Sequence, residues 1–122
     1  EFTARASFDM FSTINLGRLT RTADPDPASS DPADLAFCHE AMRGLAGLND
    51  LLLQPHHRLL FALFGVKTAL LRAFYEASDA AYARARALTD ELLARADAGE
   101  AVTPLEANCY VVRAVRRPRE QA

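Results

Sequence analysis

The longest periodic pattern of apolar residues lies in the middle of the chain, between Pro55 and Ala98. Apolar side chains recur there at intervals of three and four residues and keep one helical phase from end to end. They are Leu60, Leu63, Phe64, Leu70, Leu71, Phe74, Ala81, Tyr82, Ala85, Leu88, Leu92, Leu93 and Ala96. The pattern predicts one amphipathic helix over residues 55–98, roughly 65 Å long at 1.5 Å per residue, which ends at Gly99.

The two halves of this predicted helix differ in how many of their faces are apolar. Residues 59–75 are apolar almost all round, whereas residues 76–97 carry Arg, Asp and Glu on the outer face. We therefore expect the first half to be buried from several sides and the second from only one. Opposite the main stripe, small residues and two larger apolar ones predict a second packing surface, for a symmetric homodimer. These interface residues are Phe61, Ala62, Gly65, Val66, Ala69 and Ala73.

Two shorter helices are predicted on either side of the long one. Asp31 is a helix cap with Pro32 at the first helical position, and the helix runs over residues 32–53. Near the C-terminus, Thr103 and Glu106 have the spacing of a capping box, which predicts a helix over residues 104–116. Pro118 is expected to stop that helix.

The N-terminal part of the chain has a mixed pattern. Residues 1–21 fit a short helix ending at Gly17, but they also alternate as an extended segment would. Residues 22–31 form an acidic, Pro-rich linker, because each Pro moves the residue before it out of the helical region. The prediction is an all-α fold, a small helical bundle with one long central amphipathic helix, whose helical domain covers residues 32–122.

Composition and charge argue against several classes of function. The chain is 50% apolar and 25% charged, as globular proteins are, and its net charge of −2 argues against a nucleic-acid partner. Cys38 and Cys109 fall on apolar faces of predicted helices, so we expect buried free thiols and a cytoplasmic protein. The longest apolar run, Leu59–Val66, is too short to span a bilayer. The opening Glu1-Phe2, without a Met, suggests a segment cut from a longer protein.

His39 is the one candidate phosphoacceptor. It begins the segment His39-Glu40-Ala41-Met42-Arg43-Gly44, which resembles histidine-phosphotransfer domains, helical bundles of about this length. Those domains place a basic residue three positions after the His, whereas Arg43 stands four positions after it. The His-Glu pair also resembles the dimerisation helix of sensor kinases. The resemblance implies a phosphorelay module, and the alternative is a histidine at the border of the apolar stripe with one local hydrogen bond.

A basic segment, His56-His57-Arg58, opens the long predicted helix. Positive charge at a helix start opposes the dipole, and backbone N–H groups are unpaired there, so the segment suits an anion such as a phosphate group. With Leu51–Leu53 beside it, the segment is similar in architecture to the four-helix membrane-localisation domains of some bacterial toxins, which implies an acidic membrane surface. The alternative is a solvated turn. A metal site is not expected, because adjacent helical residues diverge by about 100°.

Two polar residues interrupt the apolar stripes. Asn49 lies within the stripe of the second helix, and Lys67 lies between Phe64 and Leu71 on the third. Buried without partners, each would cost several kcal/mol. We interpret them as a polar pair that fixes helix register. Two alternatives stay open: a groove that closes on a partner, and a Lys67 side chain that extends along its stem to water.

The sequence contains no signature of catalysis. It has no Gly-rich phosphate loop, no Cys-x-x-Cys pair, and no nucleophile–base or carboxylate-pair spacing. We therefore expect no enzyme, no cofactor and no metal. The leading hypothesis is a small regulatory or adaptor domain that acts by helix packing against another protein, as a homodimer. The alternatives are a membrane-surface module that uses His56, His57 and Arg58, and a phosphotransfer-like module that uses His39.

Overall fold

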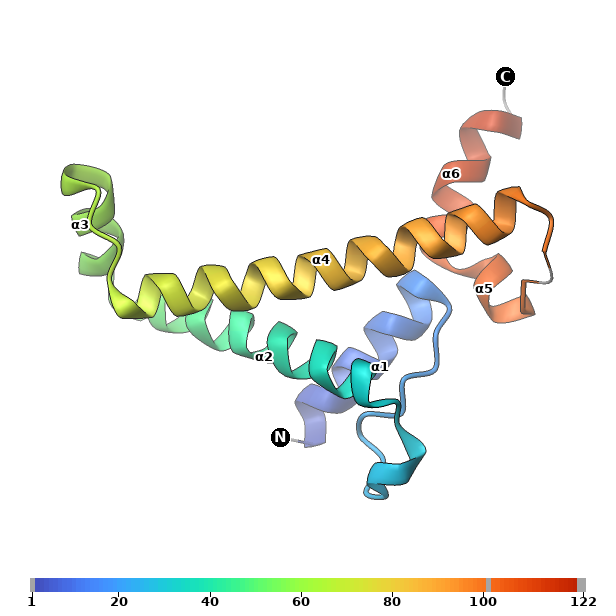
Figure 1. The fold of residues 1–122 in the computed structure, drawn as a ribbon, viewed down its shortest axis with the longest axis horizontal. Coiled ribbons are helices and arrows are strands. Elements are labelled where there is room, and N and C mark those ends of the chain that lie inside the picture. Colours follow the sequence, from blue (N-terminus) through green and yellow to red (C-terminus); the bar gives the residue numbers. More distant parts are fainter. Residues whose placement is uncertain (1, 101, 121–122) are drawn as a thin grey trace. The chain divides into compact units, whose positions relative to one another are not determined.

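The computed structural model describes residues 2–100 and 102–120, and the side chains of these residues except Pro27 and 116–120. Within these residues the chain is helical and forms no strand. Its helices are α1 (Phe2–Leu16), α2 (Pro32–Leu53), α3 (His56–Phe64), α4 (Ala69–Asp97), α5 (Pro104–Asn108) and α6 (Tyr110–Glu120), with a 3-10 turn at Pro27–Ser29 (Figure 1). The predicted all-α fold with one long helix is confirmed, and α4 is that helix.

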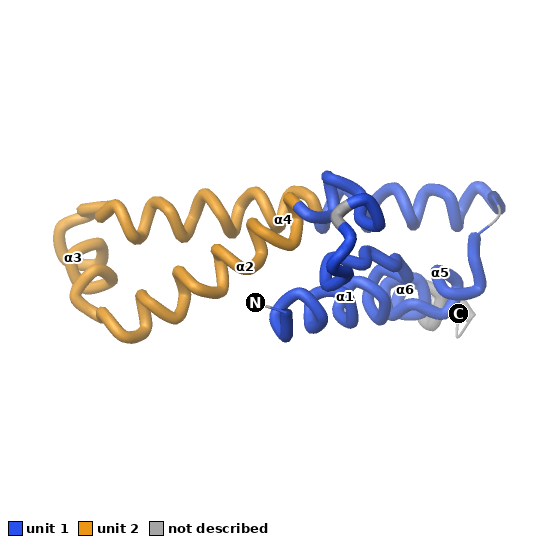
Figure 2. Tube along the Cα trace, turned by 90° about the horizontal axis from the view of Figure 1, so that it is seen from below, with its two compact units in different colours: residues 1–35, 85–122 blue, residues 36–84 orange. Residues whose placement is uncertain are grey.

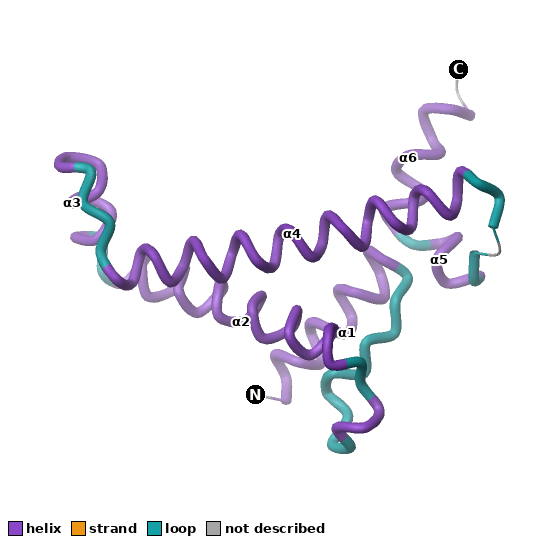
Figure 3. The backbone as a smooth tube through the Cα atoms, viewed as in Figure 1, coloured by secondary structure: helices purple, strands orange, loops and turns teal. Residues whose placement is uncertain are grey.

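The single helix predicted over residues 55–98 is wrong, because the chain leaves the helix at Gly65 and forms a loop to Thr68 (Figure 3). Gly65 ends α3 with the left-handed angles φ 67° and ψ 14°, and its N–H donates to the Phe61 carbonyl. A residue without a Cβ adopts this conformation at little cost, so the glycine works as a C-cap. The apolar stripe is therefore divided between α3 and α4.

The predicted helix starts are confirmed, and the predicted C-terminal helix is wrong. Asp31 accepts a hydrogen bond from the Ala33 N–H at 2.8 Å at the start of α2, and Thr103 forms the capping box with Glu106. The helix predicted over residues 104–116 is two helices, because Cys109 is extended, with ψ 159°. After this break α6 runs past Pro118 to Glu120. In α6 a proline removes one N–H donor without ending the helix.

The chain divides into two compact units, which Figure 2 distinguishes by colour. Unit 1 consists of residues 1–35 and 85–122, and unit 2 consists of residues 36–84. Unit 1 thus joins the N-terminal helix to the C-terminal part of the chain. The helix predicted within residues 1–21 is present as α1, and Gly17 follows its last residue with φ 64°.

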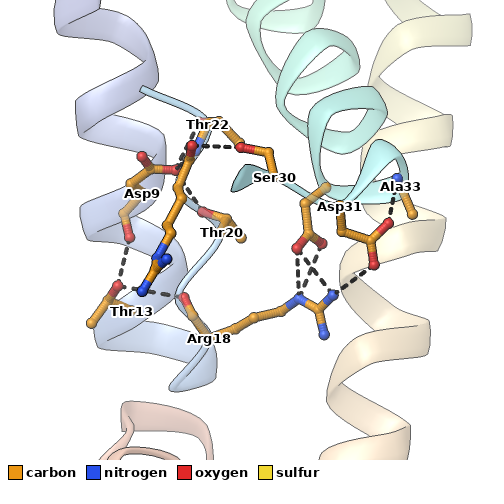
Figure 4. A network of polar contacts seen from close by, with 10 residues as sticks. Asp9, Thr13, Arg18, Thr20, Thr22, Ser30, Asp31 and Ala33 are labelled. Carbon is orange, nitrogen blue, oxygen red and sulfur yellow. Dashed lines mark hydrogen bonds and ion pairs between the residues drawn. The ribbon is translucent and has the colours of Figure 1, made fainter. Parts of the chain in front are cut away.

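Unit 1 is held together on one side by the carboxylate of Asp9 (Figure 4). This side chain accepts hydrogen bonds from the Thr20 hydroxyl at 2.6 Å, from the Thr22 hydroxyl at 2.7 Å and N–H at 2.9 Å, and from the Ala23 N–H at 3.0 Å. Arg18 forms a bidentate pair with the buried Asp34, with both contacts at 3.0 Å. The Asp9 bonds fix the chain after α1 against that helix, and the Arg18–Asp34 pair ties the same segment to the start of α2.

On its other side unit 1 has a small apolar core. Leu92 from α4 packs with Cys109 and with Val112 from α6, all of them buried. Next to this cluster, Arg95 donates to Glu106 at 2.8 Å and so ties α4 to the capping box of α5. The core of unit 1 therefore depends on residues that follow the break at Cys109.

Unit 2 is a pair of helical segments joined by α3. Two glycines of α2 allow α4 to approach closely: a Cβ at Gly44 would lie 3.3 Å from the Ser78 hydroxyl, and one at Gly47 would lie 3.3 Å from the Phe74 Cβ. Deeper in the pair, Leu51 and Leu71 are buried. Within this unit α3 lies where α2 ends and α4 begins (Figure 1).

Candidate functional site

The main candidate site is the end of unit 2 at which α3 lies. Six of the nine residues of α3 are apolar, in the sequence HHRLLFALF, and no residue of this helix is buried. Neighbouring residues of α2, α4 and the loop add further exposed apolar side chains. We call the whole set the apolar end: Leu48, Leu52, Leu53, Leu59, Leu60, Phe61, Leu63, Phe64, Val66 and Tyr75, each of them 37–73% exposed.

The size of the apolar end separates it from an ordinary protein surface. At roughly 100 Å² of exposed area for each of these side chains, the set offers on the order of 1,000 Å². The largest apolar patch of a typical monomer is about 300–600 Å², whereas one partner of a standard interface contributes about 800 Å². The apolar end is therefore large enough for a stable interface.

A groove of about 620 Å³ runs through the apolar end. One wall is the α3 face that carries Arg58, Leu59, Phe61 and Ala62. The rest of the lining comes from Leu48, Leu51, Leu52 and Pro55 on one side and from Leu71, Phe74 and Tyr75 of α4 on the other. Ligand and peptide sites have this mostly apolar lining with few polar groups.

The opposite face of α3 lines no part of this groove. At 100° per residue, Leu60, Leu63 and Phe64 lie on the side away from Ala62. Leu63 is 71% exposed and Phe64 is 73% exposed. The helix therefore has one apolar face along an open groove and a second one that projects into solvent.

The charges of this region have one sign. Residues 51–75 contain Arg58, Lys67 and Arg72 and no Asp or Glu, although the chain has 16 acidic residues in all. The Lys67 ammonium lies 6.0 Å from the centre of the Phe61 ring and 5.9 Å from that of Tyr75. These are cation–π distances, and they place a positive charge beside the groove residues.

The side chains of the basic segment His56-His57-Arg58 have different neighbours in the structure. The His57 ring contacts the Thr68 hydroxyl through Nδ1 at 2.9 Å and the Gln54 amide oxygen through Nε2 at 3.2 Å. Arg58 lines the groove instead. His57 thus links the start of α3 to the loop that follows it, and His56 stacks beside it with ring centres 4.1 Å apart.

The six predicted interface residues are all exposed, as an open packing surface requires. They do not form one strip along one helix, however. Phe61 and Ala62 are on α3, Gly65 and Val66 are in the loop, and Ala69 and Ala73 are on α4. That these residues form an interface stays a prediction, but they now lie on α3, the loop and α4 and not on one continuous helix.

Asn49 and Lys67 are not a buried pair within the described chain, and that interpretation is wrong. Both residues are exposed, and Lys67 is in the loop after α3, where a helical stripe no longer applies. Because both side chains are exposed to water, they do not need a polar partner inside the protein. The two alternatives raised from the sequence, a groove open to a partner and a lysine that reaches water, agree with these positions.

His39 is exposed on α2, and Arg43 does not contact it through a described hydrogen bond. The Arg43 guanidinium donates instead to the Glu40 carboxylate at 3.1 Å and 3.3 Å. His39 is thus accessible to solvent, as the phosphotransfer hypothesis requires, but the basic residue Arg43 is paired with Glu40.

Clusters of metal-ligating side chains and membrane-spanning helices are both absent among the described residues. No group of three His, Cys, Asp or Glu side chains among them could hold a metal ion, and Cys38 and Cys109 are both buried. None of the described helices combines the length and the apolar character needed to cross a membrane.

Reasoning from the sequence did not predict the groove, although it named Arg58, Phe61 and Ala62 as site residues. A continuous helix over residues 55–98 leaves no room for the turn at Gly65, which lets α3 line a groove together with α2 and α4. The available signal was the sequence Phe64-Gly65, a glycine directly after an apolar run, which is typical of a helix end.

Comparison of the chain with protein families, with curated proteins and with solved structures gives no match.

Proposed function

We propose that this chain is a binding module that acts by helix packing through the apolar end of unit 2, as a homodimer with a regulatory or adaptor role. The observation that carries the proposal is α3, an apolar helix without a single buried residue. A helix with apolar residues on opposite faces is stable in water only when something covers those faces. Each large apolar side chain that becomes buried contributes about 1.5–3 kcal/mol.

Several features support binding rather than catalysis. The groove is lined by aliphatic and aromatic side chains, with Arg58 as its one charged residue among those described. Such a lining selects apolar partners and offers no acid–base pair for chemistry. The buried positions of Cys38 and Cys109 fit a reducing, cytoplasmic setting for this role.

Sedimentation equilibrium at tens of micromolar tests the proposal, because standard interfaces of this area hold at such concentrations. The expected mass is twice the 13.4 kDa of the chain. A monomer throughout this range would contradict homodimerisation through the apolar end.

A second candidate function is attachment to an acidic membrane surface. The observation in its favour is the stretch 51–75, in which apolar side chains alternate with Arg58, Lys67 and Arg72 and acids are missing. Helices that lie at a bilayer surface combine these two features, and each basic residue near acidic lipids adds about 1 kcal/mol. Flotation with vesicles of acidic phospholipid tests it: attachment that disappears in neutral lipid or in high salt would support this function, and no attachment would exclude it.

A further inference from the structure

A single flat partner cannot cover both apolar faces of α3. One face lines an open groove, and the other presents Leu63 and Phe64 to solvent. A bilayer surface would cover the projecting face and leave the groove unfilled. A bound apolar ligand would fill the groove and leave the projecting face exposed.

We infer that the occupant of the groove is Leu63 and Phe64 of a second copy of this chain, and that the two copies exchange these side chains reciprocally. This inference rests on the proposed homodimer and names its contact. Each copy then supplies one projection and one groove, and a twofold axis satisfies both at once. A single kind of partner thereby covers both apolar faces of α3.

The area and the volume agree with this arrangement. The apolar end offers on the order of 1,000 Å² per copy, against the about 800 Å² that one partner of a standard interface contributes. Two large side chains are a small part of a groove of about 620 Å³, so the groove also has room for the backbone of the last turn of α3. Fully buried aromatic and aliphatic anchors of this kind dominate the energy of an interface.

The C-terminal end of α3 and the Arg58 side chain of the groove carry charges of opposite sign. Phe64 is the last residue of α3, so the projection carries the C-terminal end of a helix, which has a partial negative charge. The groove contains Arg58 and has no acidic residue among its described lining. A helix C-terminus that enters the groove of the other copy therefore meets a cation.

Two variants separate the projection from the groove. Phe64→Ser removes most of the projection, and Ala62→Trp fills the groove, since Ala62 lines it and is exposed. Tyr82→Ser is the matched control, because Tyr82 is 70% exposed in the same unit, close to the 73% of Phe64, but lies outside the apolar end. Circular dichroism confirms in each case that the helices are retained.

We expect Phe64→Ser and Ala62→Trp each to raise the dimer dissociation constant at least tenfold, which corresponds to about 1.4 kcal/mol, and Tyr82→Ser to leave it unchanged. A mixture of the two variants should form a heterodimer at least tenfold tighter than either homodimer. The Ala62→Trp copy keeps its Phe64 and the Phe64→Ser copy keeps its open groove, so one contact is restored.

The other outcomes decide between the inference and the proposed function. A wild-type monomer contradicts the homodimer itself, and if that monomer floats with acidic vesicles the apolar end belongs to a membrane surface. A wild-type dimer that both variants leave intact keeps the homodimer and overturns the reciprocal contact. Two weakened variants that fail to recover on mixing also overturn it, because the projection and the groove then do not face each other.

Discussion

At the scale of single residues, Gly65 decides how the middle of the chain is built. Its φ of 67° lies in the left-handed region, where a residue with a Cβ costs about 1–2 kcal/mol. A Cβ at this position would meet no atom within 4 Å, so the cost comes from the backbone alone. We expect Gly65→Ala to lower the free energy of unfolding by about 1 kcal/mol, as measured by urea denaturation.

The sign of this effect distinguishes the observed turn from a continuous helix. In the middle of a helix the same substitution would raise stability by about 1 kcal/mol, because Ala is the better helix former. Gly65→Asn serves as a control, since Asn tolerates the left-handed region and should cost less than Ala. Stabilisation by Gly65→Ala would show that α3 and α4 are one helix in solution.

The pKa of the Asp9 carboxyl determines how the free energy of unfolding of unit 1 changes with pH. Burial acts to raise the pKa of this carboxyl, but the hydrogen bonds from Thr20, Ala23 and Thr22 together outweigh burial and lower the pKa. The pKa of Glu106 is lowered as well, above all by the hydrogen bond from Arg95. A lowered pKa in the folded state stabilises above the unfolded value of about 4, and this contribution is lost as the pH falls through the folded value.

The free energy of unfolding should therefore be flat between about pH 7 and 5 and fall below about pH 4. Asp9→Asn should cost about 1–3 kcal/mol at pH 7, because the amide cannot accept all four hydrogen bonds, and it should reduce the loss in acid. Asp90→Asn is the control, since the side chain of Asp90 is 69% exposed. An unchanged acid profile in Asp9→Asn would contradict the role of this carboxylate.

At the scale of helices, the sequence predicted the outer bounds of the helices better than the breaks inside them. Asp31 and Thr103 were identifiable because a cap is a local pattern of one side chain and nearby N–H groups. The ends at Gly65 and Cys109 were missed because apolar spacing continues across them. The four residues of the loop after α3 carry the chain into α4 without disturbing the spacing of Leu63, Phe64 and Leu70, so periodicity alone could not reveal the break.

The exposure of α3 leads to a prediction about hydrogen exchange. In a monomer the amides of a short helix without buried residues should exchange rapidly, since local opening exposes little apolar surface. In a dimer the same amides should be protected. We expect protection of residues 56–64 to rise with protein concentration from nanomolar to tens of micromolar, while amides of α1 change little, and exchange that ignores concentration would contradict coverage of α3 by a second copy.

At the scale of the whole molecule, the division into units could not be read from the sequence. Residues 1–21 and 22–31 were separated from a helical domain over residues 32–122, yet unit 1 combines residues 1–35 with 85–122. These distant segments meet where α1 packs against α6 and where Gly17 lies close to the backbone of Glu106. Apolar periodicity shows which face of a helix is buried, but it does not show which distant helix covers that face.

The homodimer also predicts how thermal stability depends on protein concentration. If the apolar end is covered only in the dimer, unfolding is coupled to dissociation, and the Tm must rise with concentration by mass action. Each tenfold increase adds about 1.4 kcal/mol per dimer, which for a pair of chains of this size is a shift of roughly 2–5 °C. Scanning calorimetry between about 5 and 500 µM measures this shift in the range where such interfaces form.

Phe64→Ser separates this effect from nonspecific association. The variant removes an exposed side chain and should cost the monomer little, so its Tm at low concentration should stay close to that of the wild type. Its Tm should then fail to rise with concentration, whereas Tyr82→Ser should follow the wild-type curve. A wild-type Tm that does not change over a hundredfold range would mean that the apolar end stays uncovered in solution, and the acidic membrane surface would then be the partner that its basic residues favour.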